Sequence, residues 1–265
     1  MAALEISRSQ IDLNADLGEE CGDDLAMLDI VTTANIAAGG HAGGGEVLSE
    51  AVQAAAARGV NLGAHVSYPD RENFGRRSLL QEISGSELAE SLLTQILDVH
   101  EAASRAGASL THVKAHGALY NDSCVDVAAA DTLLGAVTNA SSRLGRVLPV
   151  MGMPSTALEQ KAAALGVPFI SEAFADRAYA SRNSLLPRHI AGAVKTQTED
   201  VVQQALNLAV GQHVFLSTGQ KENISVVTLC LHGDTDGAVE HARAVRAALK
   251  AAGVVVSGER LRNLP

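Results

Sequence analysis

Polar and apolar residues alternate strictly in the stretch Gln10-Ile-Asp-Leu-Asn-Ala-Asp16, near the start of the chain. Successive side chains of a β-strand point to opposite faces, so a strand here places Asp12, Asn14 and Asp16 on one face. The opposite face is wholly apolar. A strand that packs on helices with one face and carries ionisable groups on the other is typical of an α/β barrel, which holds its chemistry at one end.

The same alternation returns in Thr111-His-Val-Lys-Ala-His116, which puts His112, Lys114 and His116 on one face. Strand-like and helical segments alternate through the rest of the chain. Strands are expected at 10–15, 31–37, 60–66, 110–115, 147–151, 167–173, 225–231 and 254–257. Helices are expected at 45–58, 84–106, 125–144, 155–165, 198–210 and 236–252. One helix between successive strands indicates right-handed βαβ units and a parallel sheet.

This order predicts an α/β fold, a TIM-like (β/α) barrel of seven or eight strands, in one domain over residues 1–265. An open doubly wound sheet also fits the periodicity, since a pattern along the chain does not show closure. Ser84 and Glu87 have the spacing of a helix capping box, and Gly107 is expected to end that helix.

The composition narrows the possible partners. Thirty acidic and 20 basic residues give a net charge of −10, and only seven residues are aromatic (4 Phe, 3 Tyr). A nucleic acid is therefore not expected as a partner, because it needs a basic surface or stacking rings. The three cysteines form no C-x-x-C pair, and no apolar run is long enough to span a membrane. We expect a cytoplasmic protein without a membrane segment.

Ionisable residues gather where the expected strands end. They are Asp16, His41, His65, Lys114, His116, Asp176, His232 and Asp234. In a barrel these ends meet at one mouth, so the residues are expected to form a site for a small molecule. A lone histidine more often supports its neighbours than reacts, and this is our interpretation of His112. The loop 68–77 adds Arg76 and Arg77, which suit a carboxylate or phosphate.

Two kinds of chemistry fit these residue types. Asp16, His41 and His65 could bind a divalent metal ion with one position left for water, as in a stand-alone hydrolase or carbohydrate deacetylase. The same side chains could also act as acids and bases without a metal.

The chain resembles the LamB/YcsF family through motifs that follow one another in family order. They are Asp12-Leu-Asn-Ala-Asp-Leu-Gly-Glu19, Ala34-Asn-Ile-Ala37, His41-Ala-Gly43, Gly63-Ala-His65, Tyr68-Pro-Asp70, Phe74-Gly-Arg-Arg77, Val113-Lys114, His116-Gly-Ala-Leu-Tyr-Asn121, Glu172, Phe174-Ala-Asp-Arg-Ala-Tyr179, Pro187-Arg188 and His232-Gly-Asp234. The chain departs from the family pattern at Gly44 and Ala115, where an acidic residue and a proline are usual.

The resemblance implies a barrel related to the glycoside hydrolase and deacetylase type, and ATP-driven opening of the lactam 5-oxo-L-proline to L-glutamate together with subunits B and C. ATP is then a cofactor, bound by this chain or elsewhere in the complex. A divalent metal, or a binding subunit without catalysis, remains an alternative.

Roles for individual residues follow as a hypothesis. Lys114, with Arg77 or Arg177, would stabilise anions, Asp16 or His65 would activate water, and His116 would be an acid or an orienting group. The remaining pocket residues would be Glu19, Asn35, His41, Tyr120, Asp176 and His232. Five of the seven aromatic residues fall in the expected site loops: Tyr68, Phe74, Tyr120, Phe174 and Tyr179.

Overall fold

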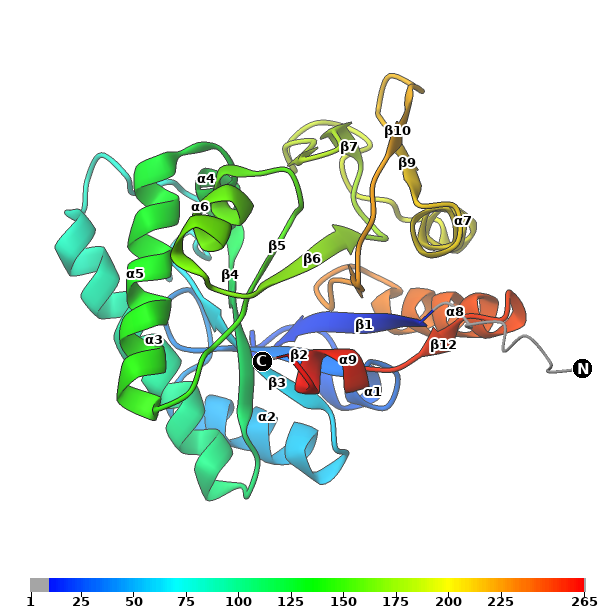
Figure 1. Ribbon diagram of the computed structural model, residues 1–265. Coiled ribbons are helices and arrows are strands. Elements are labelled where there is room, and N and C mark those ends of the chain that lie inside the picture. Colours follow the sequence, from blue (N-terminus) through cyan, green and yellow to red (C-terminus); the bar gives the residue numbers. More distant parts are fainter. Residues whose placement is uncertain (1–9, 265) are drawn as a thin grey trace, which may run out of the picture.

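A computed structural model describes residues 10–264 of the chain. Seven parallel strands form a closed ring, because the last of them, β11, pairs back onto β1. In ring order they are β1 (Gln10–Leu17), β2 (Thr33–Ala37), β3 (Asn61–Val66), β4 (Leu110–Ala115), β5 (Val150–Gly152), β6 (Phe169–Phe174) and β11 (Thr228–Cys230). Helices surround the ring (Figure 1). The predicted (β/α) barrel is confirmed, with seven strands in the ring.

The eighth expected strand exists but does not help to close the barrel. β12 (Val255–Val256) pairs with Gln10 and Ile11 at the beginning of β1. Farther along, β1 pairs with β11 through Asp12–Asn14 and with β2 through Asn14–Leu17. β12 therefore lies beside the start of one ring strand.

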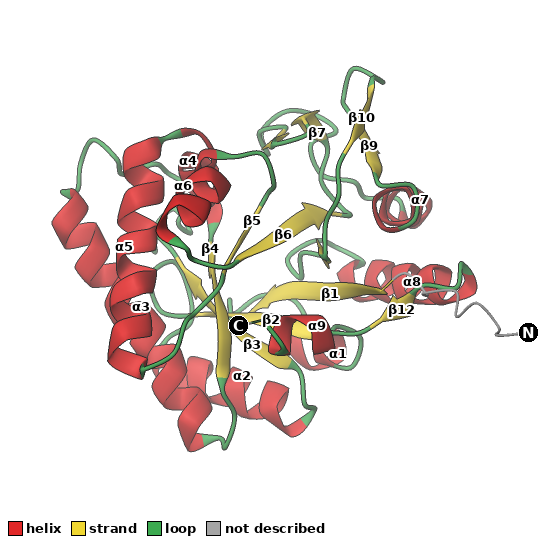
Figure 2. Cartoon of the chain, in the orientation of Figure 1, coloured by secondary structure: helices red, strands yellow, loops and turns green. Residues whose placement is uncertain are grey.

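Helices lie along the outside of the ring, except for the last, whose Leu261 packs against Met151 and Ile170 of two ring strands (Figure 2). They are α1 (Asp24–Leu28), α2 (Gly45–Ala57), α3 (Gly85–Arg105), α4 (Gly117–Val125), α5 (Val127–Leu144), α6 (Ala157–Leu165), α7 (Thr198–Ala209), α8 (Ala238–Ala251) and α9 (Glu259–Arg262). The capping box of α3 is present between Ser84 and Glu87, and Gly107 follows the helix with φ of +70°. No helix among residues 10–264 is long and apolar enough to cross a membrane.

The structure adds elements that the sequence pattern did not indicate. The helix expected at 125–144 begins at Val127, because Asp126 caps it, and the separate helix α4 precedes it. Two short hairpins also occur: β7 (Tyr179–Ser181) with β8 (Ser184–Leu185), and β9 (His213–Phe215) with β10 (Lys221–Asn223). Both hairpins lie on the same side of the barrel, at the upper right of Figure 1.

The side chains that β1 points into the ring are polar, as its successive inward-facing residues Asp12 and Asn14 show. At the lower of these two positions, the carboxylate of Asp12 accepts hydrogen bonds from the hydroxyls of Thr32, Thr33 and Thr228. Burial raises the pKa of Asp12 above its ordinary value. One level higher, Asn14 bonds to Thr228 and accepts a hydrogen bond from Asn35. These bonds join strands that are distant in sequence and fix the positions of the side chains above them.

Candidate functional site

A cavity of about 560 Å³ lies at the carboxyl ends of the ring strands. Seven of the predicted site residues line it: Asp16, His65, Lys114, His116, Tyr120, Arg177 and His232. Loop residues complete the wall, among them Arg76 and the segment Asn183–His189 that follows β7. The structure thus brings the strand-end residues together at one mouth, as barrel geometry requires.

Four other predicted residues support the wall from behind. Asn35 bonds to the Asp16 carboxylate at 2.8 Å, and Asp176 holds His232. Glu19 and His41 contact each other at 3.0 Å beside the cavity. The twelfth, Arg77, is not brought to the cavity. Its guanidinium pairs with Glu82 at 2.6 Å, and about half of its side chain is exposed.

Lys114 occupies the centre of the network and is completely enclosed. Its ammonium lies 2.9 Å from Asp16 Oδ1 and 2.7 Å from Glu172 Oε1. Although burial alone would lower it, the adjacent carboxylates raise the pKa of Lys114 well above its ordinary value. Two carboxylates already neutralise this ammonium, so in this arrangement it holds Asp16 and Glu172 in place.

Asp16 is held as an ionised carboxylate. Oδ1 accepts hydrogen bonds from Asn35 and Lys114, and Oδ2 lies 3.2 Å from His65 Nε2. Burial opposes ionisation, but His65 and Lys114 hold the pKa of Asp16 well below its usual range. A carboxylate that is ionised at neutral pH and faces a cavity can accept a proton from water.

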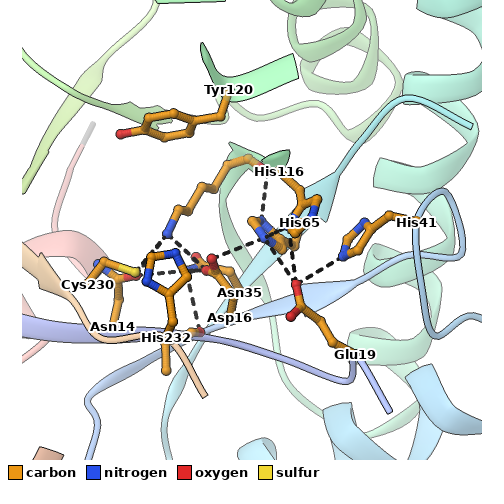
Figure 3. A network of polar contacts seen from close by, with 12 residues as sticks. Asn14, Asp16, Glu19, Asn35, His41, His65, His116, Tyr120, Cys230 and His232 are labelled. Carbon is orange, nitrogen blue, oxygen red and sulfur yellow. Dashed lines mark hydrogen bonds and ion pairs between the residues drawn. The ribbon is translucent and has the colours of Figure 1, made fainter. Parts of the chain in front are cut away.

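Three imidazole rings converge on Glu19 (Figure 3). Glu19 Oε1 lies 3.0 Å from His41 Nε2, 3.2 Å from His116 Nδ1 and 3.6 Å from His65 Nε2. His65 Nε2 and His116 Nδ1 are 3.0 Å apart. Burial lowers the pKa of His41 to about 3 and also lowers the pKa of His116. We call Glu19, His41, His65 and His116 the imidazole cluster; its four ligand atoms all lie within 4.8 Å of one another, as metal ligands do.

On the other side of Asp16, His232 is oriented by Asp176. The ring Nδ1 and the backbone N–H of His232 both lie 2.9 Å from Asp176 Oδ2. Because a carboxylate only accepts, Nδ1 carries the proton and Nε2 is left for the cavity. An Asp16 oxygen, the Cys230 sulphur and a ring nitrogen of His232 all lie within 4.8 Å of one another.

Arginines line the rim of the cavity. Asp234 Oδ2 lies 2.7 Å from Arg76 Nη2 and 3.2 Å from Arg188 Nη1, which come from different loops. Arg177 is more deeply placed and donates to the backbone carbonyls of Ala193 and Leu186. Burial and the nearby Arg188 lower the pKa of Arg177 to about 10. This end of the cavity suits an anionic group.

The five aromatic residues divide between two positions. Tyr120 and Phe174 line the cavity. Phe74 packs edge-on against His41 and His116, with ring centroids 5.3 Å apart in each case. Tyr68 and Tyr179 are fully buried and, like Phe74, lie outside the cavity wall, so two of the five aromatic residues in the site loops line the cavity. The hydroxyls of Tyr68 and Tyr179 instead fix the loops, bonding to Asp122 and to the backbone N–H of Phe174.

Sequence reasoning did not assign roles to Glu172 or Arg188. Glu172 Oε2 accepts a hydrogen bond from Tyr120 at 3.0 Å, and Oε1 pairs with Lys114. The sequence feature that could have identified Glu172 is its position as a single acidic residue in the largely apolar stretch Phe169-Ile-Ser-Glu-Ala-Phe174. An unpaired acid would be unfavourable in a buried strand, which points to a cationic partner.

Known proteins resemble the chain over nearly its whole length. The A subunit of 5-oxoprolinase from Streptomyces avermitilis is 43% identical over 252 residues, which cover 93% of this chain and 98% of the relative. The protein of the same name from Streptomyces coelicolor is 44% identical over 249 residues, covering 92% and 97%. The crystal structure of a lactam utilization protein from Thermus thermophilus superimposes with a TM-score of 0.84 at 36% identity, covering 94% of this chain and 99% of that one.

A family comparison matches residues 11–262 to the LamB/YcsF family. The match spans the ring strands, apart from Gln10 at the start of β1, and every residue of the imidazole cluster. The chain belongs to the LamB/YcsF family.

Proposed function

We propose that this chain is the lactam-opening subunit of an ATP-dependent 5-oxoprolinase, which converts 5-oxo-L-proline to L-glutamate. The names of its relatives and of its structural neighbour support the proposal. The observation that carries it is the placement of the Asp16 carboxylate and the Asp176-oriented ring of His232 at one cavity, within 4.8 Å of each other.

Hydrolysis of a lactam requires two proton transfers at atoms bonded to one carbon. Water oxygen bonds to the ring carbonyl carbon and gives up a proton, and the bond from that carbon to nitrogen breaks as the nitrogen takes one up. A base and an acid must therefore lie a few ångströms apart. Asp16, held ionised by His65 and Lys114, is the base in this scheme. In its imidazolium form, which the adjacent Asp176 carboxylate stabilises, His232 carries a second proton on Nε2 and delivers it to the departing nitrogen.

The position of His116 gives it an orienting role. Its Nε2 lies 3.0 Å from the backbone carbonyl of Phe74, and its Nδ1 faces His65, so neither nitrogen is free for the substrate. The arginine rim suits the substrate carboxylate, because a guanidinium binds a planar anion through parallel hydrogen bonds. Arg188 and Arg177 line the cavity and are the groups we assign to it.

An amide carbonyl reacts slowly with water, and ATP can activate it. Transfer of the terminal phosphoryl group of ATP to the lactam oxygen releases ADP and makes the ring carbon a better electrophile for water. Ring opening then leaves an acyl phosphate, which a second water hydrolyses to glutamate and inorganic phosphate. The sequence has no G-x-x-x-x-G-K-[ST] motif. We therefore assign the phosphoryl transfer to partner subunits B and C and the ring opening to this chain. The relatives are themselves named as one subunit of an enzyme, which agrees with a complex of several chains. A cytoplasmic location accompanies this proposal, in line with the three free cysteines.

The test is reconstitution of the complex with subunits B and C. Mixed with 5-oxoproline and ATP, the assembled complex is expected to release ADP and glutamate in a substrate-dependent manner. Absence of glutamate from a well-assembled complex would overturn the proposal.

A further inference from the structure

The hydrogen bonds around the imidazole cluster fix which ring nitrogens carry protons. His65 Nδ1 lies 3.3 Å from the backbone carbonyl of Lys114, and His116 Nε2 lies 3.0 Å from that of Phe74. Carbonyl oxygens only accept, so both of these nitrogens are protonated. In the neutral rings His65 Nε2 and His116 Nδ1 are consequently bare, and they face each other at 3.0 Å.

Two bare nitrogens at this separation repel each other unless a positive charge lies between them. Glu19 Oε1 points at the same spot, 3.2 Å from His116 Nδ1 and 3.6 Å from His65 Nε2, and His41 Nε2 lies 3.0 Å from that oxygen. Electron pairs from four side chains therefore converge on one point. Backbone carbonyls that orient histidines through the far nitrogen are a common feature of metal sites.

We propose that Glu19, His41, His65 and His116 bind one divalent transition-metal ion, zinc in the first place, beside the substrate cavity. Ligand atoms around a tetrahedral zinc ion, at bond lengths of about 2.0–2.1 Å, lie about 3.3 Å apart. The contacts of Glu19 Oε1 with the three rings, at 3.0, 3.2 and 3.6 Å, match that spacing. Three imidazoles favour zinc or its first-row neighbours over magnesium and calcium, which take oxygen ligands.

The buried carboxylates of the barrel interior also favour a bound cation. Asp12, Asp16, Glu19 and Glu172 are all buried there, whereas the buried ammonium of Lys114 contacts only Asp16 and Glu172 of these four. Buried carboxylates need cationic partners or strong donors. Asp12 is satisfied by hydroxyl groups, and Lys114 serves Asp16 and Glu172. Among the described residues, the ion-pair contacts of Glu19 are with the three rings of the imidazole cluster, and a divalent ion bound there would balance its charge.

The protein holds the ligand rings rigidly. His41 and His116 stack in parallel, with ring centroids 3.6 Å apart and an interplanar angle of 2°. Gly75, with φ of +61°, packs so closely over them that a Cβ atom there would come within 2.9 Å of His41 Cβ. His65 and His116 also line the cavity, while Glu19 and His41 lie behind it. The ion would thus have ligands on one side and the substrate cavity on the other, where it would supply Lewis acidity.

The proposal is tested on the full chain, purified without chelators or metal-affinity resin. Elemental analysis is expected to find close to one zinc per chain. The chelator-stripped protein is expected to bind Zn²⁺ in calorimetry, and Co²⁺ to give visible d–d absorption. The decisive comparison is Glu19→Gln with Glu172→Gln. Both remove a buried carboxylate beneath the same cavity with little change in volume, but only Glu19 belongs to the imidazole cluster.

Glu19→Gln is expected to weaken Zn²⁺ binding at least about tenfold, because loss of even an outer partner costs metal sites that much. Glu172→Gln is expected to bind Zn²⁺ as the natural chain does. Circular dichroism of each variant serves as the control for correct folding. A metal-free natural chain that binds neither Zn²⁺ nor Co²⁺, or equal Zn²⁺ binding by the two variants, would overturn the proposal. These measurements need no substrate or partner, so their failure is separate from a failure of the lactam-opening proposal.

Discussion

Asp176 Oδ2 accepts two hydrogen bonds from His232, one from ring Nδ1 and one from the backbone N–H, each at 2.9 Å. The two hydrogen bonds fix both the imidazole ring and the backbone of His232. Asp176 follows β6 and His232 follows β11, which are adjacent in the ring. The pairing of these strands therefore determines the proton donor that we assign to the departing nitrogen.

Replacement of Asp176 by Asn is expected to slow ring opening while leaving substrate affinity nearly intact. An Asn amide carries no negative charge, so it does not stabilise the imidazolium form of His232 that donates the proton. General acid catalysis contributes about 10²–10⁴-fold, so kcat should fall by about that factor, with little change in KM. Asp131→Asn, on the exposed side of α5 where Asp131 pairs with Lys161, serves as the control. An unchanged kcat for Asp176→Asn would remove His232 from the proposed mechanism.

Arg188→Met is expected to raise KM for 5-oxoproline. Arg188 lines the cavity and shares the single carboxylate of Asp234 with Arg76, so one positive charge of the two arginines is left for an incoming carboxylate. Hydrogen bonds to charged groups contribute about 1.5–3 kcal/mol, which corresponds to a rise of about 10- to 100-fold. Arg182→Met, an arginine outside the cavity wall, should leave KM unchanged. Equal KM values for the two variants would show that the rim does not bind the carboxylate.

Acid is expected to destabilise the fold partly through His112. This fully buried ring bonds to Asn35 at 2.7 Å, and burial together with the nearby charge of Lys114 lowers its pKa to about 3. The folded state keeps the ring neutral, whereas the unfolded chain takes up a proton below the ordinary value of 6.5. The stabilisation is complete above that value and is lost as pH falls towards 3, by about 1.4 kcal/mol per pH unit.

Urea unfolding at about pH 7.5 and about pH 5.5 checks this expectation. The free energy of unfolding of His112→Gln should differ between the two conditions by about 1 kcal/mol less than that of the natural chain. An equal pH dependence in the two proteins would contradict the assignment.

Gly63→Ala is expected to destabilise the barrel. Gly63 lies in β3 beneath His112, and a Cβ atom there would meet the His112 ring and come within 2.8 Å of Asn35 Oδ1. Overpacking of a filled interior costs about 1–3 kcal/mol. Gly135→Ala is the matched control, because nothing lies within 4 Å of its Cβ position in α5. That helical substitution should stabilise by about 0.5–1 kcal/mol. Thermal unfolding of both variants tests this prediction. Equal melting temperatures would contradict the claim that the space around Gly63 is filled.

The fold was predictable where local pattern and tertiary packing agree. The alternation in β1 and β4 follows from burial of one face, and the long helices show their apolar stripes in the sequence. The two hairpins were not predictable, because strands of two or three residues carry no periodicity. β12 was found, but its place beside β1 depends on strand register rather than on local pattern.

The site was predictable to the level of residues that gather at strand ends. The choice between adjacent residues was not, as Arg76 and Arg77 illustrate. The backbone turns at Phe74 and Gly75, with φ of +53° and +61°, and this turn sends Arg76 to the cavity and Arg77 to Glu82. Such a turn is decided by packing against His41 and His116, which are distant in sequence. The neutralisation of Lys114 by Asp16 and Glu172 likewise depends on three strands meeting in the ring.

The central claim is that ring opening takes place in this chain, with Asp16 as the base. The most direct measurement is glutamate formation from 5-oxoproline and ATP by the complex reassembled with Asp16→Asn. Size-exclusion chromatography establishes that assembly matches that of the natural chain. The account predicts normal assembly with glutamate formation reduced at least about 100-fold. Full glutamate formation by a normally assembled Asp16→Asn complex would contradict it.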